Sequence, residues 1–419
     1  MKRYDSYKDS GVKWIGEIPS HWKIKKIKYI FEERSEKGFP NEPVLCSTQK
    51  YGVIPQSMYE NRVVVVNKGL DGLKLVRKGD FVISLRSFQG GIEYAHYQGI
   101  ISAAYTILAL NMGINADYMK YLLKSYDFIQ LLQTCVTGIR EGQNINYALL
   151  RKNYIALPSL AEQRAIVSFL DTELGKIDSY MDKEQQLIER LKELKQSLIA
   201  HAVTHGIDPN VKMKPSGIDW IGEIPEHWKL LRAKNMFQRM NRPVRPEDET
   251  ITCFRDGQVT LRKRRRLEGF TESFKEIGYQ GIRKGDLVIH QMDAFAGSIG
   301  VSDSDGKGTP VYICLQPKGS ENNFYYAYLL REMARTGYIK SLYRGIRERS
   351  SDFRFETLAK LFLPIPPASE QRAIVDYLQD KTSKIDKLIT EKTREMEYMK
   401  ELRQRIISDA VTGKIDVRS

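Results

Sequence analysis

Three stretches of this 419-residue chain combine arginine, lysine, glutamine and asparagine in patterns that can contact nucleic acid. Arginine pairs with guanine edges and glutamine or asparagine with adenine edges, while lysine and arginine also bind phosphates. Two of the stretches contain glycine, which is typical of exposed turns between regular elements. The predicted contact residues are Arg86, Ser87, Gln89, Arg140, Gln143, Asn144, Arg262, Lys263, Arg264, Arg265, Gln291, Arg347, Arg349 and Ser350.

The first stretch occurs twice, as Arg86–Gly91 after the β-rich run Phe81–Leu85 and as Gln291–Gly297 after Leu287–His290. Both copies keep a phenylalanine and a glycine but differ in their polar residues. Related domains that recognise different base sequences would differ in this way. The alternative is a structural turn in which Arg86 pairs with a neighbouring carboxylate.

The second stretch also occurs twice, at residues 138–144 and 345–351. Each copy starts with Gly-Ile-Arg-Glu and then diverges in its polar residues. The shared Arg-Glu pair could be a structural ion pair. We therefore assign nucleic-acid contact to the divergent polar residues in preference to Glu141 and Glu348.

The third stretch, Arg262–Arg266, is the densest basic run and has no equivalent in the first half of the chain. We interpret it as a loop that tracks phosphates, which would make binding depend on salt through counterion release. The alternative is a solvated charged surface.

The overall composition also favours an anionic partner. Lysine and arginine outnumber aspartate and glutamate by 66 to 52, which gives a net charge of +14. The excess lies in residues 1–158, at +8, and in residues 206–366, at +7. No apolar run approaches a membrane span, no apolar leader is visible, and the four cysteines are far apart. We therefore expect a cytoplasmic protein, with nucleic acid favoured as its anionic partner.

The chain is a tandem repeat with a period of about 208 residues. The matching segments are 10–23 with 216–229, 77–83 with 283–289, 138–141 with 345–348, 162–167 with 370–375 and 202–204 with 410–412. These matches follow one another in order with little drift, which predicts two copies of one fold.

Each copy is expected to end in a long helix. Residues 162–204 contain no proline, and apolar residues recur at spacings of three, four and seven over Ile166–Ala202 and again over Ile374–Ala410. Ser159 and Glu162 predict a capping box at the first helix start, and Gly206 and Gly413 are expected to follow the helix ends. The matched apolar stripes predict that the helices pair. An antiparallel pair is expected because it lets the second helix return toward the first globular part.

The remaining segments predict mixed α/β domains of the α+β class, because no regular βαβ period or glycine-rich nucleotide turn is present. Helices are expected at 116–133 and 323–342, among short β-rich runs that also include residues 62–67, 100–110 and 311–315. The predicted organisation is a globular domain at 1–158, a helix at 159–205, a second globular domain at 206–366 and a helix at 367–419, in a pseudo-two-fold arrangement with the paired helices between the domains.

Motifs for catalysis are missing from the sequence. The only Pro-Pro pair, Pro366-Pro367, is not part of the Asn/Asp-Pro-Pro-Tyr/Phe motif of amino-methyltransferases, and no GxxxxGK[ST] phosphate loop occurs. His201 and His205 have the spacing of two metal ligands, but no third ligand is nearby, so no metal site is expected. The four tryptophans repeat in both halves and are expected to pack structural elements together.

The chain resembles the specificity subunit of Type I restriction–modification systems over essentially its whole length. The resemblance rests on Trp14–Trp22 and Trp220–Trp228, which both match Trp-Ile-Gly-Glu-Ile-Pro-x-His-Trp. It rests also on Pro158–Ile166 and Pro366–Ile374, which match Pro-x-x-x-Glu-Gln-x-x-Ile, and on the alternation of globular segments with long helices.

This resemblance implies a division of labour. The globular segments would be target recognition domains, each of which reads one half of a bipartite, asymmetric sequence in duplex DNA. The helices would set the spacer and dock two modification subunits, which bind S-adenosylmethionine and methylate adenine. Restriction subunits would add cleavage driven by ATP and Mg²⁺. This chain would be non-catalytic and would hold no cofactor or metal.

The residues alone leave two other functions open. One is the recognition part of a standalone methyltransferase or nuclease, which the missing catalytic motifs disfavour. The other is a coiled-coil scaffold whose basic domains bind RNA or an acidic protein.

Overall fold

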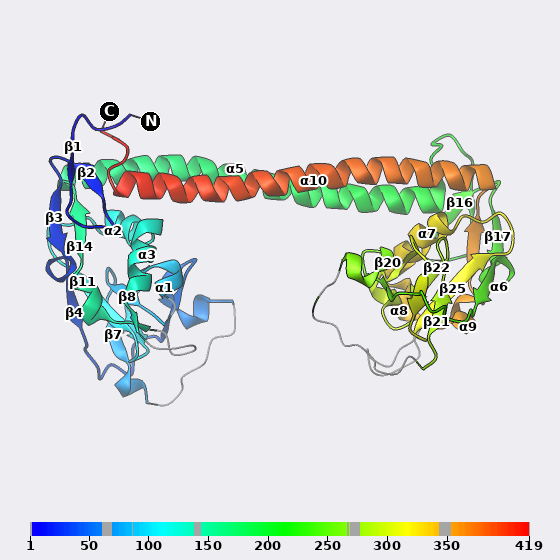
Figure 1. Cartoon of the computed structure of the whole chain (residues 1–419), viewed down its shortest axis with the longest axis horizontal. Coiled ribbons are helices and arrows are strands. Elements are labelled where there is room, and N and C mark those ends of the chain that lie inside the picture. Colours follow the sequence, from blue (N-terminus) through cyan, green and yellow to red (C-terminus); the bar gives the residue numbers. More distant parts are fainter. Residues whose placement is uncertain are drawn as a thin grey trace. The chain divides into compact units, whose positions relative to one another are not determined.

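The computed structural model describes residues 2–60, 69–85, 87–137, 144–265, 268, 277–342 and 353–418. The chain divides into two compact units: unit 1 comprises Met1–Gln185 with Thr393–Ser419, and unit 2 comprises Gln186–Lys392. Both boundaries fall inside long helices, α5 (Leu160–His205) and α10 (Ala368–Val411), which are conspicuous in Figure 1. Each unit therefore contains an α/β part and a segment of both long helices.

The α/β part of unit 1 is built around an antiparallel sheet with the strand order β4-β11-β8-β9. Smaller two-stranded pairs accompany it: β1 with β2, β3 with β14, β5 with β6, β7 with β10, and β12 with β13. The strands are β1 (Tyr7–Asp9), β2 (Glu17–Pro19), β3 (Lys23–Lys26), β4 (Phe31–Arg34), β5 (Leu45–Thr48), β6 (Gly52–Pro55), β7 (Lys74–Val76), β8 (Phe81–Ile83), β9 (Glu93–Tyr94), β10 (Gly99–Ile101), β11 (Thr106–Leu110), β12 (Val136–Thr137), β13 (Asn144–Ile145) and β14 (Tyr154–Leu157). The shorter α-helices are α1 (Ser87–Gly90), α2 (Ala116–Leu122), α3 (Tyr126–Thr134) and α4 (Tyr147–Leu150).

The α/β part of unit 2 repeats this plan with an antiparallel sheet of order β18-β25-β22-β23. The strands are β15 (Met213–Pro215), β16 (Glu223–Pro225), β17 (Lys229–Arg232), β18 (Phe237–Met240), β19 (Ile251–Cys253), β20 (Val259–Leu261), β21 (Gln280–Ile282), β22 (Leu287–His290), β23 (Ile299–Val301), β24 (Gly306–Gly308), β25 (Tyr312–Pro317) and β26 (Phe362–Ile365). The shorter α-helices are α6 (Ala233–Met236), α7 (Asn323–Arg335), α8 (Tyr338–Ser341) and α9 (Phe355–Leu358). The shared strand order confirms the tandem repeat and the α+β class.

The repeated Arg-Lys-Gly-Asp segment forms the turn that enters the central strand of each sheet. In unit 1, buried Asp80 accepts the Arg77 N–H at 2.8 Å just before β8. In unit 2, buried Asp286 accepts the Arg283 N–H at the same distance just before β22. This motif therefore belongs to the shared framework of the two units.

The two shorter predicted helices are each broken in the structure. The segment 116–133 forms α2 and α3, because the Ser125 side chain caps the start of α3. The segment 323–342 forms α7 and α8, because Gly337 adopts a φ of +79° that ends α7. Local capping residues thus interrupted patterns that looked continuous in the sequence.

The strand predictions have a similar outcome. Leu287–His290 forms β22 as predicted. The predicted run 100–110 forms two strands, β10 and β11, with a turn at Ser102–Tyr105 between them. The β-rich run 62–67 lies outside the described residues.

The long helices pair in an antiparallel sense within unit 1. Ile166, near the start of α5, shares a core with Ala410, near the end of α10. Farther along, the Arg403 guanidinium donates to the Asp178 carboxylate at 3.1 Å. The predicted antiparallel pairing is therefore confirmed for this unit.

Unit 2 shows the same pairing with the other halves of the helices. Val203, near the end of α5, shares a core with Ile374, near the start of α10. Lys195 of α5 pairs with Asp386 of α10 at 2.7 Å. No described helix is both long enough and apolar enough to cross a membrane.

The predicted apolar stripe is wrong at two matched positions. Leu194 is 49% exposed and Leu402 is 41% exposed, so neither lies in the helix pair. A straight α-helix drifts relative to a strict seven-residue repeat, which turns some heptad positions outward. The predicted helix ends are confirmed: Gly206 and Gly413 follow the last turns with φ of +81° and +77°.

Candidate nucleic-acid interface

A buried carboxylate at the start of α5 anchors the N-terminal part of unit 1. Glu162 accepts hydrogen bonds from Trp22 Nε1 (3.0 Å) and the Tyr4 hydroxyl (2.8 Å), and lies 2.9 Å from His21 Nε2. Burial and the Glu162 carboxylate raise the pKa of Tyr4, so its hydroxyl stays a donor. The Glu162 N–H donates to Ser159 Oγ (3.3 Å), but the Glu162 carboxylate contacts Trp22, Tyr4 and His21. Only half of the predicted capping box therefore forms.

Unit 2 repeats this arrangement at the start of α10. Trp228 Nε1 donates to the Glu370 carboxylate at 3.0 Å, and His227 Nε2 lies 2.7 Å from it. Trp22 and Trp228 are fully buried, so their predicted packing role is confirmed. The Trp-Ile-Gly-Glu-Ile-Pro-x-His-Trp and Pro-x-x-x-Glu-Gln-x-x-Ile motifs therefore contact each other in both units, since the last tryptophan of the first donates to the glutamate of the second.

The next residue of each helix entry orients a second helix. Gln163 Oε1 accepts the Asn115 N–H (2.8 Å), and Gln371 Oε1 accepts the Asn322 N–H (2.7 Å). Asn115 and Asn322 cap the starts of α2 and α7. The helix entries therefore organise the starts of α2 and α7.

The first predicted stretch of unit 1 lies at the end of β8, on the short helix α1. Ser87 is only 2% exposed, and its hydroxyl accepts the Ser84 N–H at 2.8 Å. Gln89 is exposed on the same helix, and Arg86 lies outside the described residues. The geometry gives Ser87 a role in closing the turn and leaves Gln89 free to reach a ligand. DNA contact by these residues stays a prediction.

The equivalent stretch of unit 2 follows β22. Gln291 is half-buried and bonds only to neighbouring backbone in this conformation. Its Nε2 donates to the Pro310 carbonyl (3.3 Å), and its carbonyl accepts the Phe353 N–H (3.0 Å). The structure therefore places Gln291 after the strand, as predicted, with its side chain directed at the protein, and its contact with DNA remains a prediction.

Most of the second predicted stretch lies outside the described residues. Asn144 is described: it is exposed and forms β13, where it pairs with Thr137 of β12. The predicted residues outside the described part are Arg140, Gln143, Arg347, Arg349 and Ser350, together with the disfavoured Glu141 and Glu348. The β12–β13 ladder fixes both ends of the stretch in unit 1.

The third predicted stretch follows β20, and its described cations already have partners. These contacts are Arg262 Nε to Thr252 Oγ1 (3.3 Å), Lys263 Nζ to Glu249 (2.6 Å), Arg264 Nη1 to Ser304 Oγ (2.9 Å) and Asp303 (3.4 Å), and Arg265 Nη2 to Asp256 (2.6 Å). Hydrogen bonds from Arg265 lower the pKa of Asp256. Phosphate binding here would require phosphates to replace carboxylates, and it stays a prediction.

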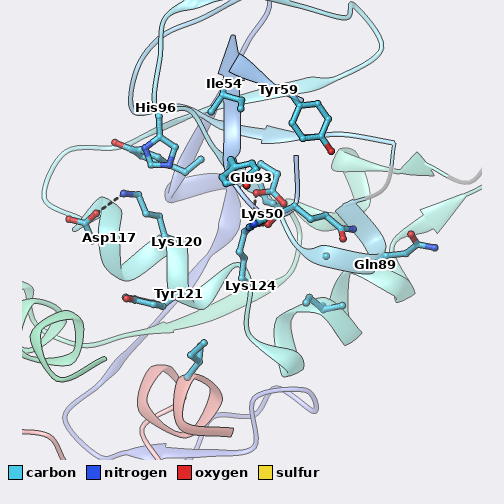
Figure 2. A pocket seen from close by; sticks show the side chains of 18 of the residues that line it. Lys50, Ile54, Tyr59, Gln89, Glu93, His96, Asp117, Lys120, Tyr121 and Lys124 are labelled. Carbon is cyan, nitrogen blue, oxygen red and sulfur yellow. Dashed lines mark hydrogen bonds and ion pairs between the residues drawn. The ribbon is translucent and has the colours of Figure 1, made fainter. Parts of the chain in front are cut away.

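A cavity of about 1400 Å³ opens in unit 1 beside α1, and sequence analysis identified only one residue of its polar lining, Gln89. Other polar residues in its lining include Gln49, Lys50, Tyr51, Glu93, Lys120, Lys124 and Arg403. Figure 2 shows Lys124 directed at Glu93, and Lys120 at Asp117. The cavity therefore joins the predicted stretch to the turn between β5 and β6.

One of the charged side chains that line this cavity, that of Glu93, is buried. The Glu93 side chain is 3% exposed and lies 2.6 Å from Lys124 Nζ. Burial raises the pKa of Glu93 to about 7, against the opposing effect of the Lys124 ammonium. Burial and the nearby Lys120 lower the pKa of His96 on the same wall. Lys120 itself lies 3.9 Å from the centre of the Tyr94 ring.

The sequence carried only a weak signal for these residues. Lys120 and Lys124 have the i,i+4 spacing of a basic helix face, which would have placed them together. Gln49–Tyr51 joins strands of four residues each, which are too short for a clear period-two pattern. The repeat comparison also missed this turn, because its polar residues differ between the two copies.

Comparison with known proteins bears on the whole chain. Residues 19–192 and 281–398 match the family described as Type I restriction modification DNA specificity domain. The Type I restriction enzyme MjaVIII specificity subunit of Methanocaldococcus jannaschii is 23% identical, over 97% of this chain and 92% of that protein. The Type I restriction enzyme EcoBI specificity subunit of Escherichia coli is 24% identical, over 83% of this chain and 81% of that protein.

Two solved structures share the fold. The crystal structure of the HsdS subunit from Thermoanaerobacter tengcongensis has a TM-score of 0.55 at 18% identity, over 97% of this chain and 99% of that one. A chain from a structural study of assembly and conformational transition of the type I R-M system has a TM-score of 0.67 at 18% identity, over 94% of this chain and 98% of that one.

The family match and the relatives decide between the predicted functions. The relatives are specificity subunits, which confirms the prediction of a non-catalytic component that recognises DNA within a restriction–modification complex. The standalone enzyme and the RNA-binding scaffold gain no support from them. Repeated motifs, duplicated α/β units and long helix pairs agree with this assignment. The chain belongs to the family of Type I restriction–modification DNA specificity proteins.

Proposed function

We propose that this chain selects a bipartite, asymmetric sequence in duplex DNA and directs adenine methylation and restriction at that sequence. The α/β part of unit 1, within residues 1–158, reads one half of the target, and that of unit 2, within 206–366, reads the other. The observation that carries this proposal is one framework built twice with different polar residues at equivalent surface positions.

The contrast between framework and surface supports an asymmetric target. Two identical readers would favour two identical half-sites, as symmetric DNA-binding dimers do. Here Gln89 stands in the first stretch of unit 1, whereas Gln291 and Asp293 stand in that of unit 2. The basic run Arg262–Arg266 occurs in unit 2 only. The two units therefore present different donors and acceptors to DNA.

The distribution of charge supports DNA as the ligand of both α/β parts. Their net charges of +8 and +7 account for all of the +14 of the chain, because the long-helix segments together contribute −1. Phosphate contacts by such residues supply affinity and orientation, while exposed amides and guanidiniums supply base choice.

Partner subunits would supply the chemistry. We assign S-adenosylmethionine to two modification subunits, and ATP with Mg²⁺ to restriction subunits, all in the cytoplasm. Arg164 and Arg372 support two equivalent docking sites, because they are exposed at matched positions of α5 and α10. Neither forms an ion pair with a residue that the structure describes.

Methylome sequencing tests this proposal directly. A host that expresses the modification subunits is compared with and without this gene, and then with the gene restored. We expect one bipartite adenine-methylation motif that disappears with the gene and returns with it. An unchanged methylome in cells that contain the modification subunits would contradict the proposal.

A binding measurement tests the ligand class independently. The chain assembled with its modification subunits is offered a labelled duplex that contains the motif, with unlabelled duplex DNA or RNA of the same sequence as competitor. We expect duplex DNA to compete at much lower concentration than RNA. Equal competition by RNA would favour the scaffold function instead.

A further inference from the structure

A turn next to the first predicted stretch is held rigidly in unit 1. Gln49–Tyr51 joins β5 to β6, and its three side chains are exposed. Thr48 Oγ1 accepts the Tyr51 N–H (3.0 Å) and donates to the Gly52 carbonyl (3.0 Å). Gly52 has a φ of +70°, and a Cβ there would lie 2.6 Å from the Tyr94 carbonyl oxygen. The turn therefore presents its side chains from a preorganised backbone.

Lys124 ties this turn to the predicted stretch. Its Nζ donates to the Gln49 carbonyl (2.9 Å) and pairs with buried Glu93 (2.6 Å), as Figure 2 shows for the ion pair. The Gln49 side chain lies over Gly90, where an added Cβ would be 2.6 Å from Gln49 Nε2. Gln49 and exposed Gln89 consequently line the same cavity.

Unit 2 contains an equivalent turn, Phe254–Gln258, between β19 and β20. Arg255, which is 67% exposed, pairs with Asp293 of the loop after β22 at 3.0 Å. Arg331 of α7 lies under Gly257, where an added Cβ would be 2.6 Å from Nη1. A cation from the helical side thus lies against the turn in unit 2 as well.

Lys124 and Arg331 occupy matching positions in the two units. Tyr118 and Tyr325 donate their hydroxyls to carbonyls on the last turns of the long helices, at 3.1 Å and 2.8 Å. Lys124 and Arg331 each follow their tyrosine by the same number of residues. The supporting cation is therefore part of the shared framework, whereas the supported turn differs in sequence and length.

We propose that the turns Gln49–Tyr51 and Phe254–Gln258 are specificity-determining elements that contact base edges of duplex DNA, each in a different half of the target. Lys124 and Arg331 are positioning residues, which hold the turns in place without touching a base. This inference rests on the proposed function and adds to it residues that read each half-site.

The chemistry of the turns suits this role. Gln49 offers an amide that pairs with adenine, and Arg255 offers a guanidinium that pairs with guanine. Lys50 supplies a cation beside the exposed Tyr51 ring, with its Nζ 4.9 Å from the ring centre. Topologically equivalent turns that differ in such residues are what two readers of different half-sites require.

The position of Lys124 separates it from the reading residues. Its ammonium is already used by a carboxylate and a backbone carbonyl within unit 1. A buried ion pair contributes little net stability, because desolvation of both charges offsets their attraction. Because Lys124 also holds the backbone of an exposed turn, we assign to this pair a role in positioning the turn.

The reading residues are tested by alanine substitution in each unit separately. Gln49→Ala with Lys50→Ala is made in one variant and Arg255→Ala in another, each assembled with the modification subunits. Base preference is measured by methylome sequencing and by binding to duplexes with single base-pair changes. We expect each variant to lose about tenfold or more discrimination at positions of one half-site, and to keep full discrimination in the other.

Lys13→Ala is the matched control, because it removes an exposed lysine of unit 1 from the segment between β1 and β2. It should leave both half-sites unchanged. Full discrimination in both turn variants would overturn the inference. A wild-type methylome without any bipartite motif would instead contradict the proposed function, so the two failures are distinguishable.

The positioning role is tested with Lys124→Met and the conservative Lys124→Arg. We expect Lys124→Met to weaken base preference in the half-site that the Gln49→Ala/Lys50→Ala variant affects and to leave the other half-site unchanged, although loss of the cation beside buried Glu93 lowers the melting temperature. Lys124→Arg should restore the preference. Uniform loss of binding to both half-sites would show a general structural role and contradict positioning.

Discussion

Unit 1 and unit 2 share a framework but differ in how the surfaces on it are charged. Both hold their α/β part to a long helix through a glutamate, buried Glu162 or half-buried Glu370, that accepts a tryptophan N–H. The surfaces differ: unit 1 opens a cavity around the Glu93–Lys124 pair, whereas unit 2 carries a basic run neutralised by carboxylates. The shared contacts serve folding, and the unshared ones are where DNA specificity can differ.

The two units differ also in how the long helix joins the α/β part. In unit 2 the chain runs on from α5 to β15 without a break. In unit 1 the chain ends meet instead: the Asp416 N–H donates to the Lys2 carbonyl (2.9 Å), and the Arg418 guanidinium lies 4.8 Å from the centre of the Tyr4 ring. In unit 1 the segment after α10 is thus held to the start of the chain by non-covalent contacts, whereas in unit 2 the peptide chain itself joins α5 to β15.

The framework can be broken most strongly at its tryptophans. Trp22→Ala and Trp228→Ala should each destabilise their own unit by about 3–5 kcal/mol, because both rings are fully buried. Hydrogen–deuterium exchange of β8 and β22 reports the opening of each unit separately. The half-buried Trp14 and Trp220 serve as controls and should cost less when changed to alanine. Equal loss of protection in both units from one substitution would contradict independent frameworks.

The second prediction uses a titrating group that only unit 1 has. Glu93 pairs with Val82 in the sheet, and Gly300 takes its place opposite Val288 in unit 2. The pKa of Glu93 is about 7, against 4.5 for an ordinary glutamate, so the folded unit binds a proton that the unfolded chain has released. The resulting stability is fully present below pH 4.5 and is lost as the pH rises to about 7.

Glu93→Gln isolates this contribution, because it keeps the size of the side chain and removes the charge. Between pH 4.5 and 7 wild-type unit 1 should lose on the order of 3 kcal/mol relative to the variant. Exchange of the β8 amides, measured across that range, detects the difference, and the β22 amides serve as the internal control. Parallel pH profiles for wild type and variant would refute the assignment.

Some features of the two units could be predicted from the sequence alone, and others could not. The starts of both long helices and the end of α5 were located within a few residues because long proline-free apolar repeats of this spacing are typical of helices, whereas α10 ends at Val411 and not at residue 419, where the predicted segment ends. The turn Gln49–Tyr51 was missed because its flanking strands are short. The carboxylates that neutralise the basic run were missed because Glu249 and Asp303 lie far from it along the chain. Local periodicity predicts elements, whereas contacts between distant residues need the fold.

The two glutamates that accept the tryptophan N–H groups should differ in what they contribute to stability. Glu162→Ala would leave Trp22 Nε1 and the Tyr4 hydroxyl without their acceptor, and should cost roughly 1–3 kcal/mol in unit 1. Glu370→Ala should cost less, because the Glu370 side chain is 21% exposed against 3% for Glu162, and water can replace it. Thermal unfolding of both variants checks the order. Equal losses of unfolding free energy in the two variants would mean that the burial of Glu162 and its hydrogen bond with Tyr4 contribute nothing to stability.

The smallest expected effect lies in the basic run of unit 2. If phosphates bind Arg264 and Arg265, they must displace Asp303 and Asp256, so replacing both arginines by alanine should flatten the salt slope by less than the roughly 0.9 per phosphate contact expected for free cations. Asp256→Asn should have the opposite effect: it frees Arg265, strengthens binding to any duplex and steepens the slope. Glu173→Gln is the control, since it removes one carboxylate charge from α5. Binding isotherms at several salt concentrations measure both changes. A loss of base discrimination without any change in slope would show that these arginines contact bases, and unit 2 would then differ from unit 1 in its way of reading DNA as well as in its charge.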